Sequence, residues 1–209
     1  MKFVVLGTGF PDIVQTIEDI LLQDKSLEFI GFLDDDECKS KKTFFGYEVL
    51  GSIDWLHNNL EVQAFNTIAR NLQTKALINE QLASNNIRFI NLLHPSVNTK
   101  FSELGREGIL ISKNVYLEAT SKICSHVMVL PGSSIGHDCE IGDNTFVGFG
   151  SNILGNVQVG KNCLIGSGTT IYPGVKISDN STTGINSIIL SDVSEGETIS
   201  SPPSRRIFS

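Results

Sequence analysis

The stretch of the chain that decides its fold is residues 134–165, which read SIGHDCEIGDNTFVGFGSNILGNVQVGKNCLI. Every sixth residue in it is aliphatic, and the same spacing continues in both directions. The pattern begins at Ile111, keeps its register to Ile177, misses once at Thr183 and returns at Ile189. The residue four positions after each aliphatic one is small or β-branched throughout.

A period of six residues is neither the 3.6-residue period of an amphipathic helix nor the two-residue alternation of a strand, so the repeat itself is the structural unit. Three hexapeptides, about 18 residues, close one triangular coil, with the aliphatic residue inside and the small residue at the tight corner. The repeats span residues 111–194 and predict a left-handed parallel β-helix. An ordinary β-sandwich with fortuitous spacing is the alternative, and the unbroken register argues against it.

Residues 1–93 follow a different pattern and predict a small Rossmann-like α/β domain. Strands are expected at residues 2–6, 28–33, 62–68 and 87–93, and helices at residues 11–22, after Gly51 and at residues 72–84. Alternating strands and helices indicate a parallel sheet whose ligand crevice lies at the carboxyl ends of the strands. Residues 94–110 are then a connector to the repeats, and residues 195–209 form a C-terminal tail.

Composition is that of a soluble cytoplasmic protein. The net charge of −7 gives no support for binding to nucleic acid or to an anionic membrane. The sequence shows neither a signal-peptide pattern nor an apolar run of membrane-spanning length.

No CxxC pair is present, and Cys139 and Cys163 occupy repeat corners, so we expect buried free thiols. A metal site is not expected, because His126 and His137 lack a third converging imidazole.

The N-terminal glycine turn has two interpretations. Gly7 and Gly9 follow the first strand, but Asp12 stands where the third glycine of a dinucleotide-binding fingerprint belongs, so a redox cofactor is not expected. The glycines either serve only the tight turn between strand and helix or form part of a nucleotide-sugar site.

Several segments carry a resemblance to a known family. They are the glycine turn, Phe32-Leu33-Asp34-Asp35, His94-Pro95-Ser96-Val97 and, most specifically, Ile135-Gly136-His137-Asp138-Cys139-Glu140-Ile141-Gly142. In these the chain resembles the bacterial sialic-acid O-acetyltransferases and UDP-4-amino-sugar N-acetyltransferases, which are hexapeptide-repeat sugar acyltransferases. The resemblance implies acetyl-CoA as donor, a homotrimer, His137 as catalytic base and Asp138 as the acid that raises its basicity. It also implies that Asp34 and Asp35 hold the uridine or ribose hydroxyls.

The chain departs from the family on the acceptor side. Phe10 follows Gly9 where relatives usually have a histidine that touches the nucleotide sugar, and Lys75 takes the place of a family arginine. On the donor side, Phe146 stands where some relatives have a histidine that contacts CoA. The expected substrate-binding residues are therefore Gly7, Gly9, Phe10, Asp34 and Asp35.

His137 and Asp138 support acyl transfer independently of the resemblance to the family. His137 and Asp138 are the third and fourth residues of their repeat and point outward, so the core does not need them. An imidazole can take the proton as an amine or hydroxyl attacks a thioester, and backbone N–H groups at the glycine-rich turns can hold the oxyanion. The alternative is a solvated surface histidine. His126 is either a surface residue or a neighbour of another subunit's His137.

The CoA site is expected along the β-helix and its tail. Gly155 stacks one coil below His137 and leaves room for the thioester, and Arg205 and Arg206 are suited to the CoA phosphates. A solvated, disordered basic tail is the alternative. The expected CoA-binding residues are Phe146, Gly155, Ser167, Gly184, Arg205 and Arg206.

The sequence therefore predicts an acetyl-CoA-dependent N-acetyltransferase of a nucleotide-linked amino sugar, acting in cell-surface glycan biosynthesis. Sugar O-acetylation is the alternative reaction, because a His-Asp pair serves either nucleophile. A non-catalytic trimeric β-helix scaffold is the alternative from another class of protein.

Overall fold

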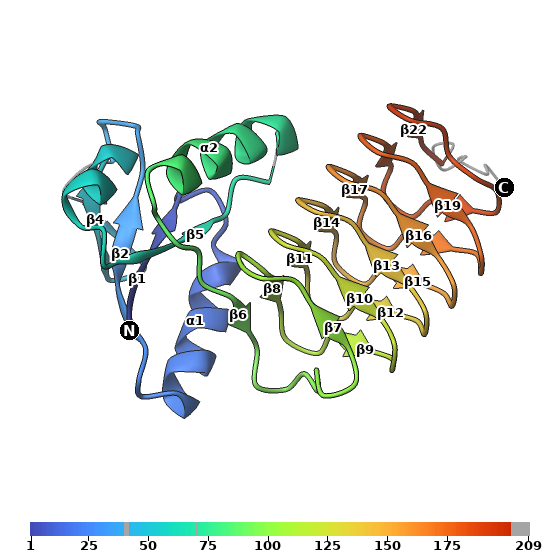
Figure 1. The fold of residues 1–209 in the computed structure, drawn as a ribbon, viewed down its shortest axis with the longest axis horizontal. Coiled ribbons are helices and arrows are strands. Elements are labelled where there is room, and N and C mark those ends of the chain that lie inside the picture. Colours follow the sequence, from blue (N-terminus) through green and yellow to red (C-terminus); the bar gives the residue numbers. More distant parts are fainter. Residues whose placement is uncertain (40–41, 70, 202–209) are drawn as a thin grey trace, which may run out of the picture.

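A computed structural model describes residues 1–39, 42–69 and 71–201 of the chain. A small α/β domain leads into a long β-helix, and the helix α1 and the strand β6 lie where the two meet (Figure 1). Within the described part of the chain, no helix has both the length and the apolar character needed to cross a membrane.

The N-terminal domain is a five-stranded sheet in the order β3-β4-β2-β1-β5, parallel except for the edge pair β3–β4. Its elements are β1 (Lys2–Leu6), α1 (Asp12–Gln23), β2 (Glu28–Leu33), β3 (Thr43–Phe44), β4 (Tyr47–Gly51), the 3-10 helix η1 (Ile53–Asn58), β5 (Gln63–Asn66) and α2 (Leu72–Ser84). The strands predicted at residues 2–6 and 28–33 and the helices predicted at residues 11–22 and 72–84 are confirmed. The helix expected after Gly51 is the short 3-10 helix η1.

Both faces of this sheet are covered because its interior strand β1 is apolar on both sides. Phe3 and Val5 of β1 pack on one face with Ile13 and Ile17, which lie four residues apart on α1. Val4 and Leu6 pack on the other face with residues of η1 and α2. Each strand exposes alternate side chains to opposite faces, so a continuous apolar strand needs helical cover on both.

The strand expected at residues 87–93 is wrong as a single element. Phe89 forms an isolated parallel bridge with Ala64 of the N-terminal sheet, whereas β6 (Leu92–Leu93) pairs with β8 (Leu110–Ile111) of the β-helix. One apolar segment thus joins two sheets. The hairpin β3–β4 was also missed, because its two strands are too short to leave a periodic signal.

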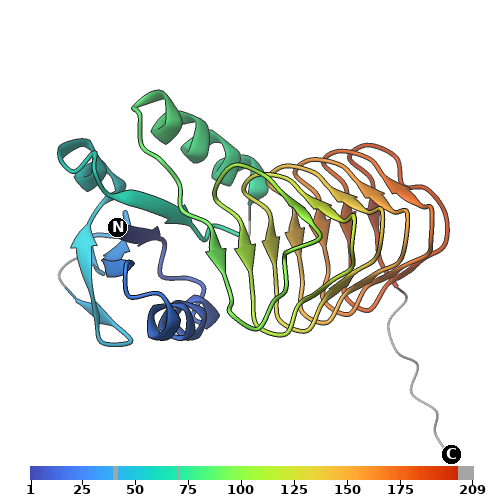
Figure 2. The same ribbon diagram turned by 60° about the horizontal axis from the view of Figure 1, so that its bottom comes forward.

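The repeats form a left-handed β-helix with three parallel ladders, which we call the first, second and third faces (Figure 2). The first face contains β6 (Leu92–Leu93), β8 (Leu110–Ile111), β11 (Met128–Val129), β14 (Phe146–Val147), β17 (Leu164–Ile165), β20 (Thr182–Thr183) and β22 (Thr198–Ile199). The second contains β7 (Glu103–Leu104), β10 (Lys122–Ile123), β13 (Glu140–Ile141), β16 (Gln158–Val159) and β19 (Lys176–Ile177). The third contains β9 (Tyr116–Leu117), β12 (Ser134–Ile135), β15 (Asn152–Ile153), β18 (Thr170–Ile171) and β21 (Ile188–Ile189).

The predicted repeat register is confirmed by the strand pairing. Ile123 pairs with Ile141 and Ile135 with Ile153, so residues 18 positions apart stack on one another. All the predicted aliphatic positions are buried in one continuous core. The ladders also extend beyond the repeats: β6 and β7 precede Ile111, and β22 follows the last repeat.

The corners between the faces share one backbone feature. Every sixth residue from Gly108 to Asn186 has a positive φ, and at eleven of these fourteen corners the residue is glycine or asparagine. These two residue types enter the left-handed region at least cost. The exceptions are Thr120, His126 and Asp138.

The three faces differ in what covers them. The first face is buried at its N-terminal end, where Leu110 and Met128 share a core with α1. The second face carries charged side chains such as Lys122 and Glu140, which form an ion pair of 2.8 Å. The third face and its corners expose large apolar side chains, namely Tyr116, Phe149, Leu154, Tyr172, Ile185, Ile188 and Leu190.

Candidate active site

The candidate catalytic pair, His137 and Asp138, occupies the corner between β12 and β13, where the third and second faces meet. The Nδ1 atom of His137 lies 2.9 Å from Oδ2 of Asp138, and both side chains are 56% exposed. Successive side chains of an extended strand diverge. Asp138 instead has a left-handed backbone with φ of 56°, which lets its carboxylate meet the preceding imidazole.

The hydrogen bond to Asp138 is the main reason why the pKa of the His137 imidazole is raised, and the charge of Glu118 acts in the same direction. The same bond lowers the pKa of the Asp138 carboxyl, and the Thr120 hydroxyl contributes to this shift. An ionised Asp138 can only accept, so the proton of a neutral imidazole resides on Nδ1. The Nε2 atom then keeps a lone pair, which a general base requires.

Gly155 lies directly against the His137 ring. A Cβ atom at Gly155 would be 2.5 Å from Nε2 of His137, closer than any side chain can come. The space that the missing side chain leaves is therefore filled by the imidazole itself. A side chain at position 155 would therefore displace the imidazole, and the expectation that the thioester lies beside Gly155 stays a prediction.

Two side chains from the preceding coil hold the backbone of the pair. Oε2 of Glu118 accepts a hydrogen bond of 2.7 Å from the N–H of His137, and Oγ1 of Thr120 accepts one of 3.1 Å from the N–H of Asp138. The sequence prediction missed both residues. A signal was present for Thr120, which stands at a repeat position where glycine and asparagine dominate.

The other expected CoA-binding residues lie away from this corner. Phe146 is on the first face, where it packs against the core shared with the N-terminal domain. Ser167 and Gly184 lie at the corner between the first and third faces, since they follow β17 and β20. Within one chain the first face is opposite the His137 corner. Arg205 and Arg206 lie outside the described residues.

The glycine turn lines a pocket of about 320 Å³ at the carboxyl ends of β1 and β5, and its walls are Gly7, Gly9, Phe10, Thr67, Ile68 and Ala69. Three of the expected substrate-binding residues therefore lie together. Gly7 also serves the turn itself, with φ of 86°. Thr67, which sequence analysis did not single out, binds the carbonyl of Leu6 at 2.7 Å and closes one wall.

The two aspartates expected at this site do not line the pocket. Asp34 accepts hydrogen bonds from the N–H and the hydroxyl of Thr8, at 3.0 and 2.6 Å, and from the Lys39 ammonium at 3.1 Å. These contacts lower the pKa of its carboxyl despite an opposing effect of burial. Asp34 thus holds the glycine turn and is not among the residues that line the pocket.

Asp35 faces a different hollow. Its Oδ1 atom accepts the N–H of Ile53 at 2.9 Å, at the start of η1, and the carboxylate borders a separate pocket of about 340 Å³ next to η1 and α2. Asp35 therefore lies apart from the pocket beside Gly7 and Gly9, and its contact with the acceptor stays a prediction. Adjacent residues at the end of a strand point to opposite sides of the sheet.

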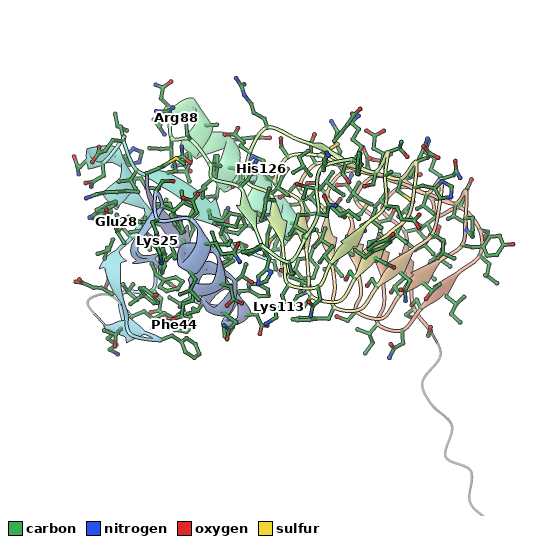
Figure 3. The ribbon with its side chains drawn as sticks, turned by 90° about the horizontal axis from the view of Figure 1, so that it is seen from below. Lys25, Glu28, Phe44, Arg88, Lys113 and His126 are labelled. Carbon is green, nitrogen blue, oxygen red and sulfur yellow. The ribbon has the colours of Figure 1, made fainter. Side chains whose placement is uncertain are left out.

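His126 is half-buried against the N-terminal domain, and its expected place beside another subunit's His137 stays a prediction. Its ring lies over Gly108, where a Cβ atom would be 2.2 Å from Nδ1, and makes an edge contact with Phe89 at 4.8 Å. Its carbonyl accepts a hydrogen bond of 2.6 Å from Nζ of Lys75 on α2. Figure 3 shows His126 where the N-terminal domain meets the first coils, so within one chain it contributes to the contact between them.

His94 also joins the two domains, as expected of a structural residue. Its Nε2 atom lies 3.0 Å from Oδ2 of Asp19 on α1, and its Nδ1 atom lies 2.8 Å from the Ser96 hydroxyl. Cys139 and Cys163 are buried free thiols, as predicted. In residues 1–39, 42–69 and 71–201, no three His, Cys, Asp or Glu side chains form a group that could hold a metal ion.

Comparison with known proteins agrees with this architecture. Residues 120–155 and 138–173 match the family model described as bacterial transferase hexapeptide (six repeats). No curated protein sequence matches the chain.

Solved structures share the fold over nearly the whole chain. The acetyltransferase domain of PglB from Neisseria gonorrhoeae FA1090, in complex with acetyl coenzyme A, is 20% identical with a TM-score of 0.82, over 99% of this chain and 98% of that one. PerB from Caulobacter crescentus, in complex with CoA and GDP-perosamine, is 21% identical with a TM-score of 0.85, over 98% and 96%. WeeI from Acinetobacter baumannii AYE is 21% identical with a TM-score of 0.83, over 98% and 99%.

Proposed function

We propose that the protein is an acetyl-CoA-dependent acetyltransferase that N-acetylates a nucleotide-linked amino sugar in cell-surface glycan biosynthesis. The observation that carries the proposal is the outward-facing pair of His137 and Asp138. The pair contributes nothing to the β-helix core, and Asp138 occupies a corner that is usually glycine or asparagine. The fold is shared with an acetyltransferase domain solved with acetyl coenzyme A and with a protein solved with CoA and GDP-perosamine.

In the proposed reaction the sugar amine attacks the thioester carbon while Nε2 of His137 takes a proton from the nitrogen. A C–N bond forms, the C–S bond breaks, and the protonated imidazole returns the proton to the leaving thiolate. Asp138 stabilises the imidazolium that exists between these steps. The pair is thus suited to the proton transfers that acyl transfer requires.

The N–H of Gly155 is the donor that we assign to the thioester oxygen. Within the described part of the chain this N–H donates no hydrogen bond. A Cβ atom at Gly136 would lie 2.7 Å from this nitrogen, so the glycine leaves it uncovered. A fixed backbone donor beside the base is the arrangement that stabilises a developing oxyanion.

A complete donor site requires more than one copy of the chain. The His137 corner lies opposite the first face, which carries Phe146, and is separated by the width of the third face from the corner that carries Ser167 and Gly184. A closed three-fold ring places different surfaces of neighbouring subunits in contact. The ring proposed here turns the apolar third face inward and sets the His137 corner of one subunit beside the first-face corner of the next, with CoA between them.

The acceptor is proposed to bind at the pocket beside the glycine turn. Phe10 supplies an aromatic surface on which a nucleobase or sugar ring can stack, and Thr67 and the backbone of Gly7 and Gly9 supply polar contacts. The pocket lies at the carboxyl edge of a parallel sheet, which is the usual ligand position in such domains.

Four measurements test the proposal. Calorimetry should show acetyl-CoA binding, whereas a non-catalytic scaffold should show none. UDP-, dTDP- and GDP-linked amino sugars should then be screened with released CoA thiol as the readout. An amide product that resists hydroxylamine would distinguish N-acetylation from O-acetylation, because an ester is cleaved. Light scattering should report a trimer, and a monomer at micromolar concentration would contradict the shared site.

A further inference from the structure

The inference concerns Thr120, which lies one coil before Asp138 in the same column of corners. Thr120 has φ of 67° and is the one β-branched residue among the described corners with a left-handed backbone. A β-branched side chain fits this region poorly, and most other corners carry glycine or asparagine instead. The sequence therefore retains an unfavourable residue at this corner, and its hydroxyl makes contacts that glycine cannot supply.

The other corners define what a regular coil does. At eleven corners between Thr120 and Asn186, the N–H of the left-handed residue donates to the backbone carbonyl nineteen residues earlier, at 2.8–3.2 Å. Asn156 donates to His137 in this way at 2.9 Å, and Asn144 to Ser125 at 2.9 Å. These bonds form a ladder along each edge of the prism.

The corner of Asp138 departs from this ladder. Its regular acceptor would be the carbonyl of Ala119. Instead, the N–H of Asp138 donates to Oγ1 of Thr120 at 3.1 Å, and the same hydroxyl donates to the carbonyl of Ala119. The hydroxyl of Thr120 is thus inserted between the two backbone groups that bind each other directly elsewhere.

We infer that Thr120 is a positioning residue whose inserted hydroxyl sets the corner of Asp138 away from the preceding coil, so that the Asp138 carboxylate meets Nδ1 of His137. A hydroxyl can take this place because it accepts one hydrogen bond and donates another. A glycine at position 120 would let the Asp138 N–H approach the Ala119 carbonyl directly. The corner would then adopt the regular geometry, in which nothing requires the two side chains to meet.

The loss of kcat expected when the Thr120 hydroxyl is removed rests on the proposed function. The accompanying change in the pKa of His137 does not. Two ionisable groups act on the His137 imidazole, the carboxylates of Asp138 and Glu118. Loss of the Asp138 contact lowers the imidazole pKa toward its ordinary value, while the contact of Glu118 with the His137 N–H remains. NMR titration of the imidazole, assigned with His137→Asn, therefore reports the positioning without any substrate.

The test compares Thr120→Gly with Thr120→Ser. Thr120→Gly removes both the poor backbone fit and the hydroxyl, so it should fold and remain as stable as the wild type by thermal unfolding. It should lower the pKa of His137 and reduce kcat about ten- to hundredfold, the loss expected from misplacing a catalytic group by about 1 Å. The KM for acetyl-CoA should stay the same. Thr120→Ser retains the hydroxyl and should keep the raised pKa and most of kcat.

Asn180→Gly is the matched control. Asn180 is also a left-handed corner residue, but its N–H makes the regular bond to the carbonyl of Lys161 at 2.8 Å. This change should alter neither the pKa of His137 nor kcat.

The outcomes separate the inference from the proposed function. A wild-type pKa of His137 in Thr120→Gly would overturn the positioning role, as would a Thr120→Ser variant that behaves like Thr120→Gly. A lowered pKa with unchanged kcat would confirm the positioning role and contradict His137 as the base.

Discussion

Lys75 provides the sharpest prediction about stability. Its side chain is 1% exposed, and Nζ donates one hydrogen bond, of 2.6 Å, to the carbonyl of His126 across the domain interface. Burial lowers the pKa of its ammonium from 10.5 to about 7. Among the described residues, no carboxylate lies within ion-pair distance of the Lys75 amine.

The pKa shift determines the sign and size of the effect. Between pH 7 and pH 10.5 the unfolded chain holds a proton on Lys75 that the folded chain has lost, so stability rises with pH in this window. At pH 7 the shift corresponds to about 4 kcal/mol of lost stability, because each pKa unit is worth about 1.4 kcal/mol. Lys75→Met removes this penalty but leaves the His126 carbonyl without its donor, at a cost of about 1–3 kcal/mol.

We therefore predict that Lys75→Met stabilises the protein by about 1–3 kcal/mol at pH 7. The wild type should gain about 3–4 kcal/mol relative to the variant between pH 7 and pH 10. Urea unfolding at fixed protein concentration, followed by the fluorescence of Trp55, measures both differences. Lys25→Met, which removes an exposed lysine, is the control and should change neither. A variant destabilised at pH 7, or a difference that does not depend on pH, would refute the reasoning.

The remaining predictions concern the proposed site. His137→Ala should reduce kcat about a hundred- to ten-thousandfold with acetyl-CoA affinity unchanged, and retention of more than about a tenth of the activity would place the base elsewhere. Asp138→Asn should reduce kcat by a smaller factor. It should also move the acidic limb of the pH profile to lower pH, because His137 acts when deprotonated and its pKa is no longer raised. Gly155→Ala should displace the imidazole and resemble His137→Ala in steady-state kinetics while the trimer persists. Phe10→Ala should raise the KM for the sugar nucleotide whereas Asp35→Ala should not, and the reverse result would restore Asp35 to the acceptor site.

The β-helix could be predicted almost completely from the sequence, and so could the candidate base. A period of six admits one architecture, because each coil repeats the same contacts on the coil before it. The outward direction of His137 then follows from its place in the repeat, two positions after the inward-facing Ile135. The turn after the first strand likewise follows from Gly7 and Gly9, and the structure shows a pocket beside it.

The roles of the acidic residues after the second strand could not be read from the sequence. Asp34 and Asp35 are adjacent and chemically alike, yet one holds the Thr8 turn and the other caps η1. Their direction depends on where β1 and η1 lie relative to β2, which no local pattern encodes. The resemblance implies that both bind a ligand, and in the structure both carboxylates accept hydrogen bonds from backbone N–H groups.

The tertiary structure alone decided which corner residues interact across coils and across domains. His126 and Asp138 occupy equivalent repeat positions, but the first is covered by Phe89 and Lys75 and the second remains open to solvent. Periodicity specifies a residue's direction from the prism axis, because that depends only on its place in the repeat. It does not specify what stands outside the prism, because that depends on how the N-terminal domain packs against one face.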